Sequence, residues 1–242
     1  MEVVTLEDPR FDQGLYTVRE AARLARVPPN TLWNWVRGYA YPTSQGTGRA
    51  KPVLAPPRED GKPALAFVNL MEALALAGFR QTGVSMQRVR KALEYAKRAM
   101  DEAHPLANQR ILTDGRDLFW EYQKRRDPEV HLVNMVKGGQ KAFPEAVERY
   151  LREVEWGRDR YAVRWWPGAR EAGAGDIVVD PKRAFGAPVV ARTGIKTEDV
   201  FDRFSAGEPM TELAEDYGLT LAQIEAAIRA EARFLEPIPA AA

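Results

Sequence analysis

Residues able to carry covalent or metal chemistry are scarce in this sequence of 242 residues. It has no cysteine and only two histidines, His104 and His131, which no carboxylate-rich helix connects. Thiolate zinc sites, iron–sulfur clusters and cysteine nucleophiles are therefore excluded, and a multi-histidine metal site is nearly excluded within one chain. No nucleophile–base pair is evident either, so we expect no enzymatic activity, no cofactor and no bound metal.

The polar residues that could bind a macromolecule are separated by charge along the chain. Residues 14–58 hold seven basic side chains and one acidic side chain, a net charge of +6. Residues 195–242 hold four basic and ten acidic side chains, a net charge of −6, although the whole chain carries only +1. Opposite charges at the two ends indicate two different partners.

The basic end has the pattern of a helix-turn-helix. Thr17 and Glu20 have the spacing of a capping box, which starts a short helix with one apolar stripe. Pro29 suits the first turn of a second helix, and Gly38 supplies its end. We expect this second helix to bury the apolar residues Leu32, Trp35, Val36 and Tyr39.

The outward side chains of the second helix can then reach the major groove of DNA. They are Asn30, Thr31, Trp33, Asn34 and Arg37. Arg19 on the first helix is a further candidate contact. The alternative is that these are ordinary solvated residues of a small helical hairpin.

Residues 41–66 have the pattern of a wing beside these helices. Strand candidates at 53–55 and 64–67 flank a tip at 56–61. We expect Arg49, Lys51 and Arg58 to contact phosphates, because a glycine-rich segment with cations suits a nucleic-acid backbone. Residues 46–48 could also cradle a nucleotide phosphate, but the lysine and serine or threonine of a phosphate-binding loop are missing.

The middle of the chain predicts helices at 68–79 and from Ser85 to Met100, a hairpin turn at 113–116 and a strand at 161–166. The second of these helices carries three cations, which either form a solvated face or contact the DNA backbone. They are Arg88, Lys91 and Arg98. The aromatic strands favour a sheet core or a subunit interface over base stacking. Residues 168–175 form the best linker candidate.

The acidic end predicts two short strands at 177–181 and 186–190, then three helices. Thr197 is the expected cap of the first helix, and Thr220 with Gln223 forms a second capping box. The outward carboxylates are Glu208, Glu212, Glu215, Asp216 and Glu225. Such a face repels phosphate, and no second motif completes a nuclease metal site, so we expect it to bind a protein.

Two resemblances add to this interpretation. Residues 16–22 followed by 27–32 resemble the winged-helix DNA-binding domains of the MerR and excisionase families, over about residues 14–80. Segments from Ile177 to Leu219 resemble the domain-of-unknown-function 433 family, over about residues 175–232, with Arg192 where that family commonly has glycine. The second resemblance implies a VapB-like antitoxin, encoded beside a PIN-like ribonuclease toxin.

We therefore expect an α+β, mainly helical fold. It would have a winged helix-turn-helix at residues 1–80, a helical and small β-hairpin connecting or dimerisation region at 81–174, and an antitoxin-family helix-turn-helix-like domain at 175–242. The expected function is a cytoplasmic type II antitoxin that neutralises its toxin and represses its own operon. Its partners would be double-stranded operator DNA, a PIN-like toxin and a second copy in a homodimer, with no membrane. The alternative is a MerR-like regulator without a toxin.

Overall fold

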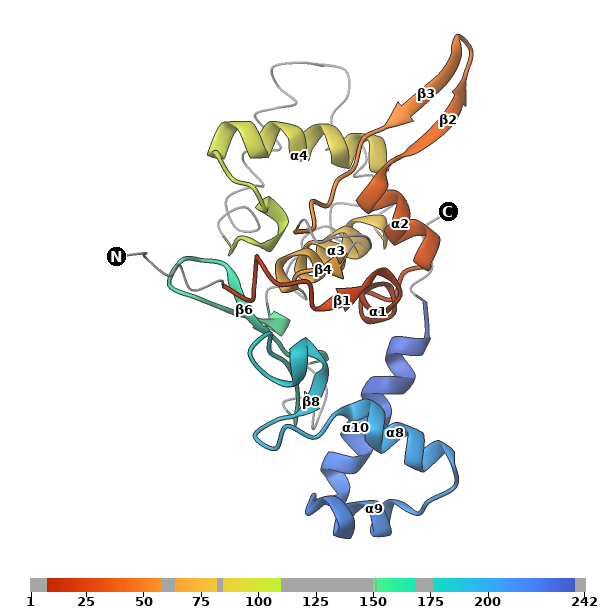
Figure 1. The fold of residues 1–242 in the computed structure, drawn as a ribbon, viewed down its shortest axis with the longest axis vertical. Coiled ribbons are helices and arrows are strands. Elements are labelled where there is room, and N and C mark those ends of the chain that lie inside the picture. The colour runs from red at the N-terminus through yellow and green to blue at the C-terminus, as the bar shows by residue number, and fades with distance from the viewer. Residues whose placement is uncertain are drawn as a thin grey trace, which may run out of the picture.

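The computed structural model describes residues 8–57, 64–81, 85–109, 150, 152–168 and 176–237. The molecule is elongated, with a protruding hairpin at one end and short helices of the acidic segment at the other (Figure 1). The described residues combine helices with sheets of short strands. The predicted hairpin at 113–116, His131 and almost all of the predicted linker lie outside the described residues.

The helix-turn-helix is present at the basic end. It consists of α1 (Val18–Leu24) and α2 (Pro29–Arg37). The predicted capping box is confirmed, since the Thr17 hydroxyl accepts from the Glu20 amide at 3.2 Å and the Glu20 carboxylate accepts from the Thr17 amide at 2.7 Å. The apolar side of α2 is buried as predicted for Leu32, Trp35 and Val36.

The sequence pattern predicts the strands of the wing at the wrong residues. The hairpin consists of β2 (Tyr39–Thr43) and β3 (Gly46–Ala50). Residues 53–55 form no strand, because the Val53 and Leu54 side chains are buried and their amides donate to the carbonyl of Trp35 at 2.8 and 3.1 Å. The β4 strand (Ala64–Leu65) pairs with β1 (Tyr16–Thr17) and not with a wing. The predicted tip falls partly on residues that are not described.

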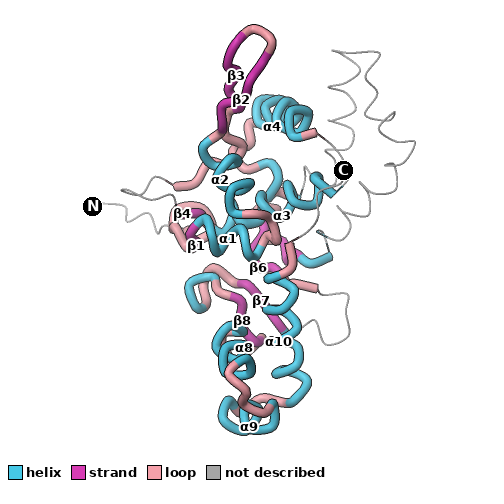
Figure 2. Tube along the Cα trace, turned by 90° about the vertical axis from the view of Figure 1, so that its right-hand side faces the viewer, coloured by secondary structure: helices cyan, strands magenta, loops and turns pink. Residues whose placement is uncertain are grey.

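The two helices that the sequence predicts at 68–79 and from Ser85 to Met100 are present. The α3 helix (Phe67–Gln81) is buried along most of its length, and α4 (Met86–Met100) lies near the hairpin (Figures 1 and 2). A short 3₁₀ helix, η1 (Pro105–Ala107), follows and packs against α3.

A four-stranded antiparallel sheet continues across the expected boundary at residue 175. Its strands are β5 (Val154–Trp156), β6 (Ala162–Trp165), β7 (Ile177–Val179) and β8 (Pro188–Val190), in that spatial order. The strands predicted at 161–166, 177–181 and 186–190 are confirmed. A second 3₁₀ turn, η3 (Ala184–Gly186), connects β7 to β8.

The acidic segment forms α8 (Thr197–Ser205), α9 (Met210–Tyr217) and α10 (Leu221–Leu235). The Thr220–Gln223 capping box is confirmed. Thr197 is not the cap of α8, because Lys196 occupies that position. The Thr197 side chain is fully buried instead, and its hydroxyl lies 2.5 Å from the Glu231 carboxylate.

The two ends of the chain share a core. The larger apolar core joins the helix-turn-helix and α3 to Trp165 of the sheet and Phe234 of α10. The buried Tyr16 hydroxyl donates to the carbonyl of Gly186 at 2.9 Å. Burial raises the pKa of this phenol well above its ordinary value, and the Asp180 charge adds to the effect. The helix-turn-helix therefore shares its core with the four-stranded sheet and with α10 of the acidic segment.

Candidate nucleic-acid interface

The outer face of α2 presents amides and one guanidinium. Asn30, Asn34 and Arg37 are exposed, as the sequence predicts. Thr31 and Trp33 are only half-buried and have contacts within the chain. Arg80 donates to the Thr31 hydroxyl at 3.2 Å, and the Arg37 guanidinium lies 4.4 Å from the centre of the Trp33 ring. The Trp33 ring thus supports Arg37, which leaves that guanidinium on the outer face.

A glycine joins α2 to the hairpin, and the backbone conformation at this position requires a glycine. Gly38 ends α2 with φ 72°, a left-handed conformation that favours glycine. A Cβ atom at this position would overlap the carbonyl oxygen of Ala50 on the facing strand. Because α2 ends at Gly38, Tyr39 starts the hairpin and is 39% exposed; it does not belong to the buried stripe of α2.

The pairing register separates two faces of the hairpin. Ala40 pairs with Arg49 and Tyr41 with Gly48, so Arg49 points away from the tyrosine face. Arg49 and Lys51 are both exposed. The predicted phosphate contact Arg58 lies outside the described residues.

The tyrosine face of the hairpin is a feature that the sequence interpretation missed. The Tyr39 and Tyr41 rings lie 6.0 Å apart, and each is more than a third exposed. Arg90 of α4 places its guanidinium 5.4 Å from the Tyr39 ring, and its Nε donates to the carbonyl of Lys51 at 2.9 Å. The sequence alternates aromatic and small residues at 39–41, shortly before Gly46 and Gly48, and this alternation predicts a strand at the position of β2.

This surface carries cations without neighbouring carboxylates in the sequence. No Asp or Glu occurs from residue 21 to residue 57. Arg23 and Arg26 in this stretch contact the acidic segment: Arg23 pairs with Glu231, and the Arg26 Nε donates to the carbonyl of Glu236 at 2.8 Å. Arg37, Arg49 and Lys51 are left to face solvent, and the exposed Arg19 lies on α1.

The five acidic candidates at the other end differ in their surroundings. Arg203 binds both Glu208 and Asp216, the latter at 2.6 Å, and the Arg203 contact holds the pKa of Glu208 below its ordinary value. Glu225 pairs with Arg229 one turn along α10. Glu212 and Glu215 are exposed, and within the described ranges they have no ion-pair partner. These two carboxylates are thus the most available for a partner.

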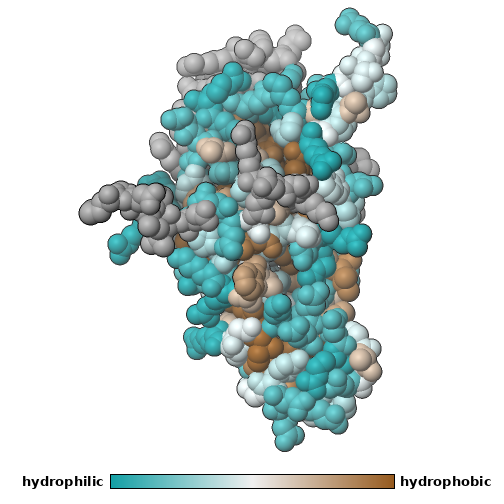
Figure 3. All heavy atoms as spheres, viewed as in Figure 1, coloured by the Kyte–Doolittle hydropathy of each residue, from teal (hydrophilic) through white to brown (hydrophobic). Residues whose placement is uncertain are grey.

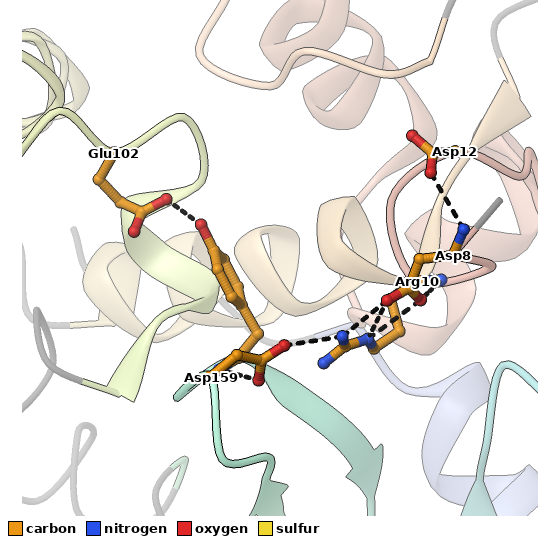
Figure 4. A network of polar contacts seen from close by, with 6 residues as sticks. Asp8, Arg10, Asp12, Glu102 and Asp159 are labelled. Atoms are coloured by element: carbon orange, nitrogen blue, oxygen red, sulfur yellow. Dashed lines mark hydrogen bonds and ion pairs between the residues drawn. The ribbon is translucent and has the colours of Figure 1, made fainter. Parts of the chain in front are cut away.

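A polar network ties residues before β1 to the β5–β6 turn (Figure 4). Arg10 binds Asp8 at 2.6 Å and Asp159 at 2.7 Å, and these contacts lower the pKa of each carboxyl. Nearby, the Tyr161 hydroxyl donates to Glu102, and burial together with that carboxylate raises the pKa of this phenol. None of the residues in this network belongs to α2 or to the hairpin.

Two further observations bear on the kind of site. In the described part of the chain, no three side chains of His, Asp or Glu gather in a way that could hold a metal ion. The same part of the chain contains no helix that is both long and apolar enough to cross a membrane.

Comparison with known proteins gives two matching family models. One, described as "Putative DNA-binding HTH domain", matches residues 14–93, and the other, described as "Protein of unknown function (DUF433)", matches residues 177–229. The helix-turn-helix and the C-terminal family expected from the sequence are thereby confirmed. The MerR type of the first domain stays a prediction.

Two relatives from Mycobacterium tuberculosis match nearly the whole chain. A protein named "Putative antitoxin VapB45" is 35% identical over 91% of this chain and 95% of its own length. A second, named "Uncharacterized protein Rv2308", is 25% identical over 90% of each chain. The crystal structure of Rv2018 from the same organism superposes with a TM-score of 0.69 at 32% identity, covering 90% of this chain and 99% of that chain.

Proposed function

Because the chain belongs to the family of the mycobacterial protein named "Putative antitoxin VapB45", we propose that it is a non-enzymatic type II antitoxin. It neutralises a PIN-like ribonuclease toxin and binds its own operator DNA as an autorepressor. This function places the protein in the cytoplasm, where its operator and the RNA substrates of the toxin are found.

The observation that carries the DNA-binding half is the acid-free surface of α2 and the hairpin. Asn30, Asn34 and Arg37 offer donors and acceptors that suit base edges, whereas Arg49 and Lys51 suit phosphates. Arg19 adds a phosphate contact beside α2. Thr31 and Trp33 act through their neighbours, since their contacts orient Arg80 and Arg37.

In this proposal the β2–β3 hairpin is the wing. It protrudes beside α2 and α4 in both views (Figures 1 and 2), so it can follow the DNA backbone while α2 enters the major groove. A homodimer would read a palindromic operator with two such surfaces, because a two-fold protein matches a two-fold site.

The toxin-binding half rests on the acidic helices. Glu212 and Glu215 offer unpaired carboxylates to a basic partner, while Glu208, Asp216 and Glu225 keep contacts with arginines of this chain. Complementary charge would speed the encounter of antitoxin and toxin more than it sets the final affinity.

One experiment tests both halves. The full chain is co-expressed with the product of the adjacent reading frame, and the purified material is titrated with DNA from upstream of its own gene. We expect a stable protein complex and specific DNA binding, with Asn34→Ala reducing the preference for operator over random DNA by about tenfold. Operator binding without any toxin complex would favour the alternative regulator, and failure of both would refute the proposal.

A further inference from the structure

The β2–β3 hairpin projects from the protein with little support along its length. Every residue of β2 is exposed, and in β3 only Gly48 and Ala50 are partly covered. The hairpin stands clear of the body, and its visible surface is neutral to hydrophilic and not apolar (Figure 3). Five residue pairs at about 3.4 Å per residue place its far end roughly 14 Å from its base, so a rotation of about 20° at the base moves the far end by roughly 5 Å. The direction of the hairpin is therefore decided at its base.

On one side, α2 holds the base of the hairpin. The chain enters the hairpin directly after Gly38, whose amide donates to the carbonyl of Asn34 at 3.0 Å. It leaves the hairpin through Lys51, and soon afterwards the Val53 amide donates to the carbonyl of Trp35. Both donors lie outside the paired strands, so these bonds fix where the hairpin begins and ends but not how it is rotated.

On the other side, Arg90 of α4 contacts both strands of the hairpin at its base. The Arg90 Nε donates to the carbonyl of Lys51, just beyond β3, and the guanidinium lies 5.4 Å from the centre of the Tyr39 ring at the start of β2. Because Tyr39 pairs with Ala50, the two contacts lie at the same level of the ribbon. One planar group that contacts both strands restricts rotation of the hairpin.

The Arg90 guanidinium is occupied by this contact and does not face solvent throughout. Its Nη2 atom is shielded from water and has no hydrogen-bond partner among the described residues. A shielded charged donor without a partner is unfavourable, so stability alone does not account for this arrangement. Arg49 points away from the tyrosine face and is exposed. Arg90 thus supports the tyrosine face and leaves the face of Arg49 open.

From these contacts we propose that Arg90 is a positioning residue for DNA binding. It holds the hairpin in the direction in which Arg49 and Lys51 reach the phosphates of the operator, and it does not touch the DNA itself. The matched DNA-binding domain, residues 14–93, ends within α4 and includes Arg90. This inference rests on the proposed function and extends the DNA-binding machinery to α4.

The position of the hairpin can be measured without DNA, because the chain contains no cysteine. Spin labels on Ser44→Cys, at the far end of the hairpin, and on Gln87→Cys, at an exposed position of α4, report the distance between them by pulsed electron paramagnetic resonance. We expect a narrow distance distribution with Arg90 in place, and with Arg90→Met a distribution broader by roughly 5 Å, the displacement that the rotation produces. Equal widths would overturn the inference.

DNA binding is measured with the full chain and DNA from upstream of its own gene. Arg90→Met should weaken the affinity about tenfold, because both hairpin cations then leave their phosphates. In a chain that already carries Arg49→Ala and Lys51→Ala, the same change should weaken it less than about twofold. If Arg90 bound a phosphate itself, the two losses would be equal, and this result would overturn the positioning role.

Tyr39 tests the same contact from the hairpin side. Tyr39→Leu removes the ring beside the guanidinium and should weaken DNA binding about threefold, since the bond from Arg90 to the carbonyl of Lys51 remains. Tyr39→Phe keeps the ring and should bind like the unmodified chain. An equal loss in both variants would mean that the tyrosine hydroxyl binds the DNA, against the inference.

The matched control is Arg98→Met on the same helix, because the Arg98 Nε donates to the carbonyl of Glu94 within α4. It should leave the distance distribution unchanged, and broadening equal to that of Arg90→Met would contradict the proposed contact. The thermal midpoint of Arg90→Met should change little, because removal of the unpaired Nη2 donor offsets the lost Nε bond. Should that variant unfold, the Tyr39 pair decides.

The outcomes also separate this inference from the proposed function. If Arg90→Met binds the upstream DNA as tightly as the unmodified chain, the inference is refuted while the proposed function stands. If the unmodified chain does not bind that DNA at all, both are refuted.

Discussion

Arg23 of α1 forms an ion pair with Glu231 of α10, whose side chain is only 3% exposed. The same carboxylate lies within hydrogen-bond distance of the buried Thr197 hydroxyl at the start of α8. One buried group therefore connects the helix-turn-helix with two helices of the acidic segment. This contact adds to the shared apolar core, which also joins the helix-turn-helix to α10.

We expect Glu231→Ala to lower the free energy of unfolding by about 3 kcal/mol. The change leaves the Arg23 guanidinium unpaired and the Thr197 hydroxyl with a weaker partner, and breaking a buried pair from one side is costly. Urea unfolding followed by circular dichroism measures this loss. Glu225→Ala is the control, because its pair with Arg229 is more than half exposed on both sides and should contribute less than about 0.5 kcal/mol.

Features that depend on residues close together in the sequence are predicted correctly, whereas features that depend on residues far apart in the sequence are missed. Both capping boxes are correct because Thr17 and Glu20, like Thr220 and Gln223, lie three residues apart and satisfy each other locally. Thr197 has the same local appearance, yet its hydroxyl meets Glu231, which is 34 residues away. No local pattern contains that partner.

The same argument explains the error in the wing. The segment at 64–65 is a strand, but its partner is β1, which lies almost 50 residues earlier in the chain. Within the candidate site, exposure of Asn30, Asn34 and Arg37 follows from helical periodicity, whereas the Arg90 contact with the hairpin depends on the packing of α4. Glu208 and Asp216 likewise share Arg203 only after α8 and α9 have folded together.

Acid should weaken the polar network around Arg10. The pKa values of Asp8 and Asp159 are lowered in the folded protein, chiefly by hydrogen bonds from Arg10. Since a lowered pKa means that the folded state binds fewer protons, this contribution is complete above the ordinary value of 3.8 and is lost as the pH falls below it. Unfolding at pH 5 and at pH 3 should show a smaller pH effect for Arg10→Met than for the unmodified chain. An equal effect would mean that other groups control the acid response.

Arg49→Ala with Lys51→Ala should weaken DNA binding equally for operator and random sequences. Each cation that leaves a phosphate reduces the number of released counterions, so the salt slope should flatten by about one to two units. Fluorescence anisotropy over a range of salt concentrations measures the slope. Arg158→Ala removes an exposed cation at the β5–β6 turn and should leave the slope unchanged, whereas an unchanged slope in the hairpin variant would remove the hairpin from the DNA contact.

Gly38→Ala should disturb the position of the hairpin relative to α2. The added methyl group meets the carbonyl of Ala50 and must adopt a φ of 72°, so we expect a loss of about 2 kcal/mol in stability and at least a tenfold loss in DNA affinity. Gly46→Ala separates the two causes, because Gly46 has a φ of 123° but no neighbouring atom within 4 Å of an added Cβ. Comparable DNA affinities for the two variants would show that backbone strain, and not the contact with Ala50, is the important term.

Separating toxin binding from DNA binding requires point changes and not a deletion. Removing residues 175–242 would take Phe234 from the core of the helix-turn-helix and leave Arg23 unpaired, so the remaining chain should be less stable and bind DNA poorly. Glu212→Gln with Glu215→Gln leaves the core intact and removes only two exposed charges. We expect slower association with a basic toxin, by about fivefold at low salt, and unchanged operator binding. Stopped-flow association rates measure this effect, with Glu94→Gln on the exposed face of α4 as the control, and identical rates would place the toxin contact away from α9.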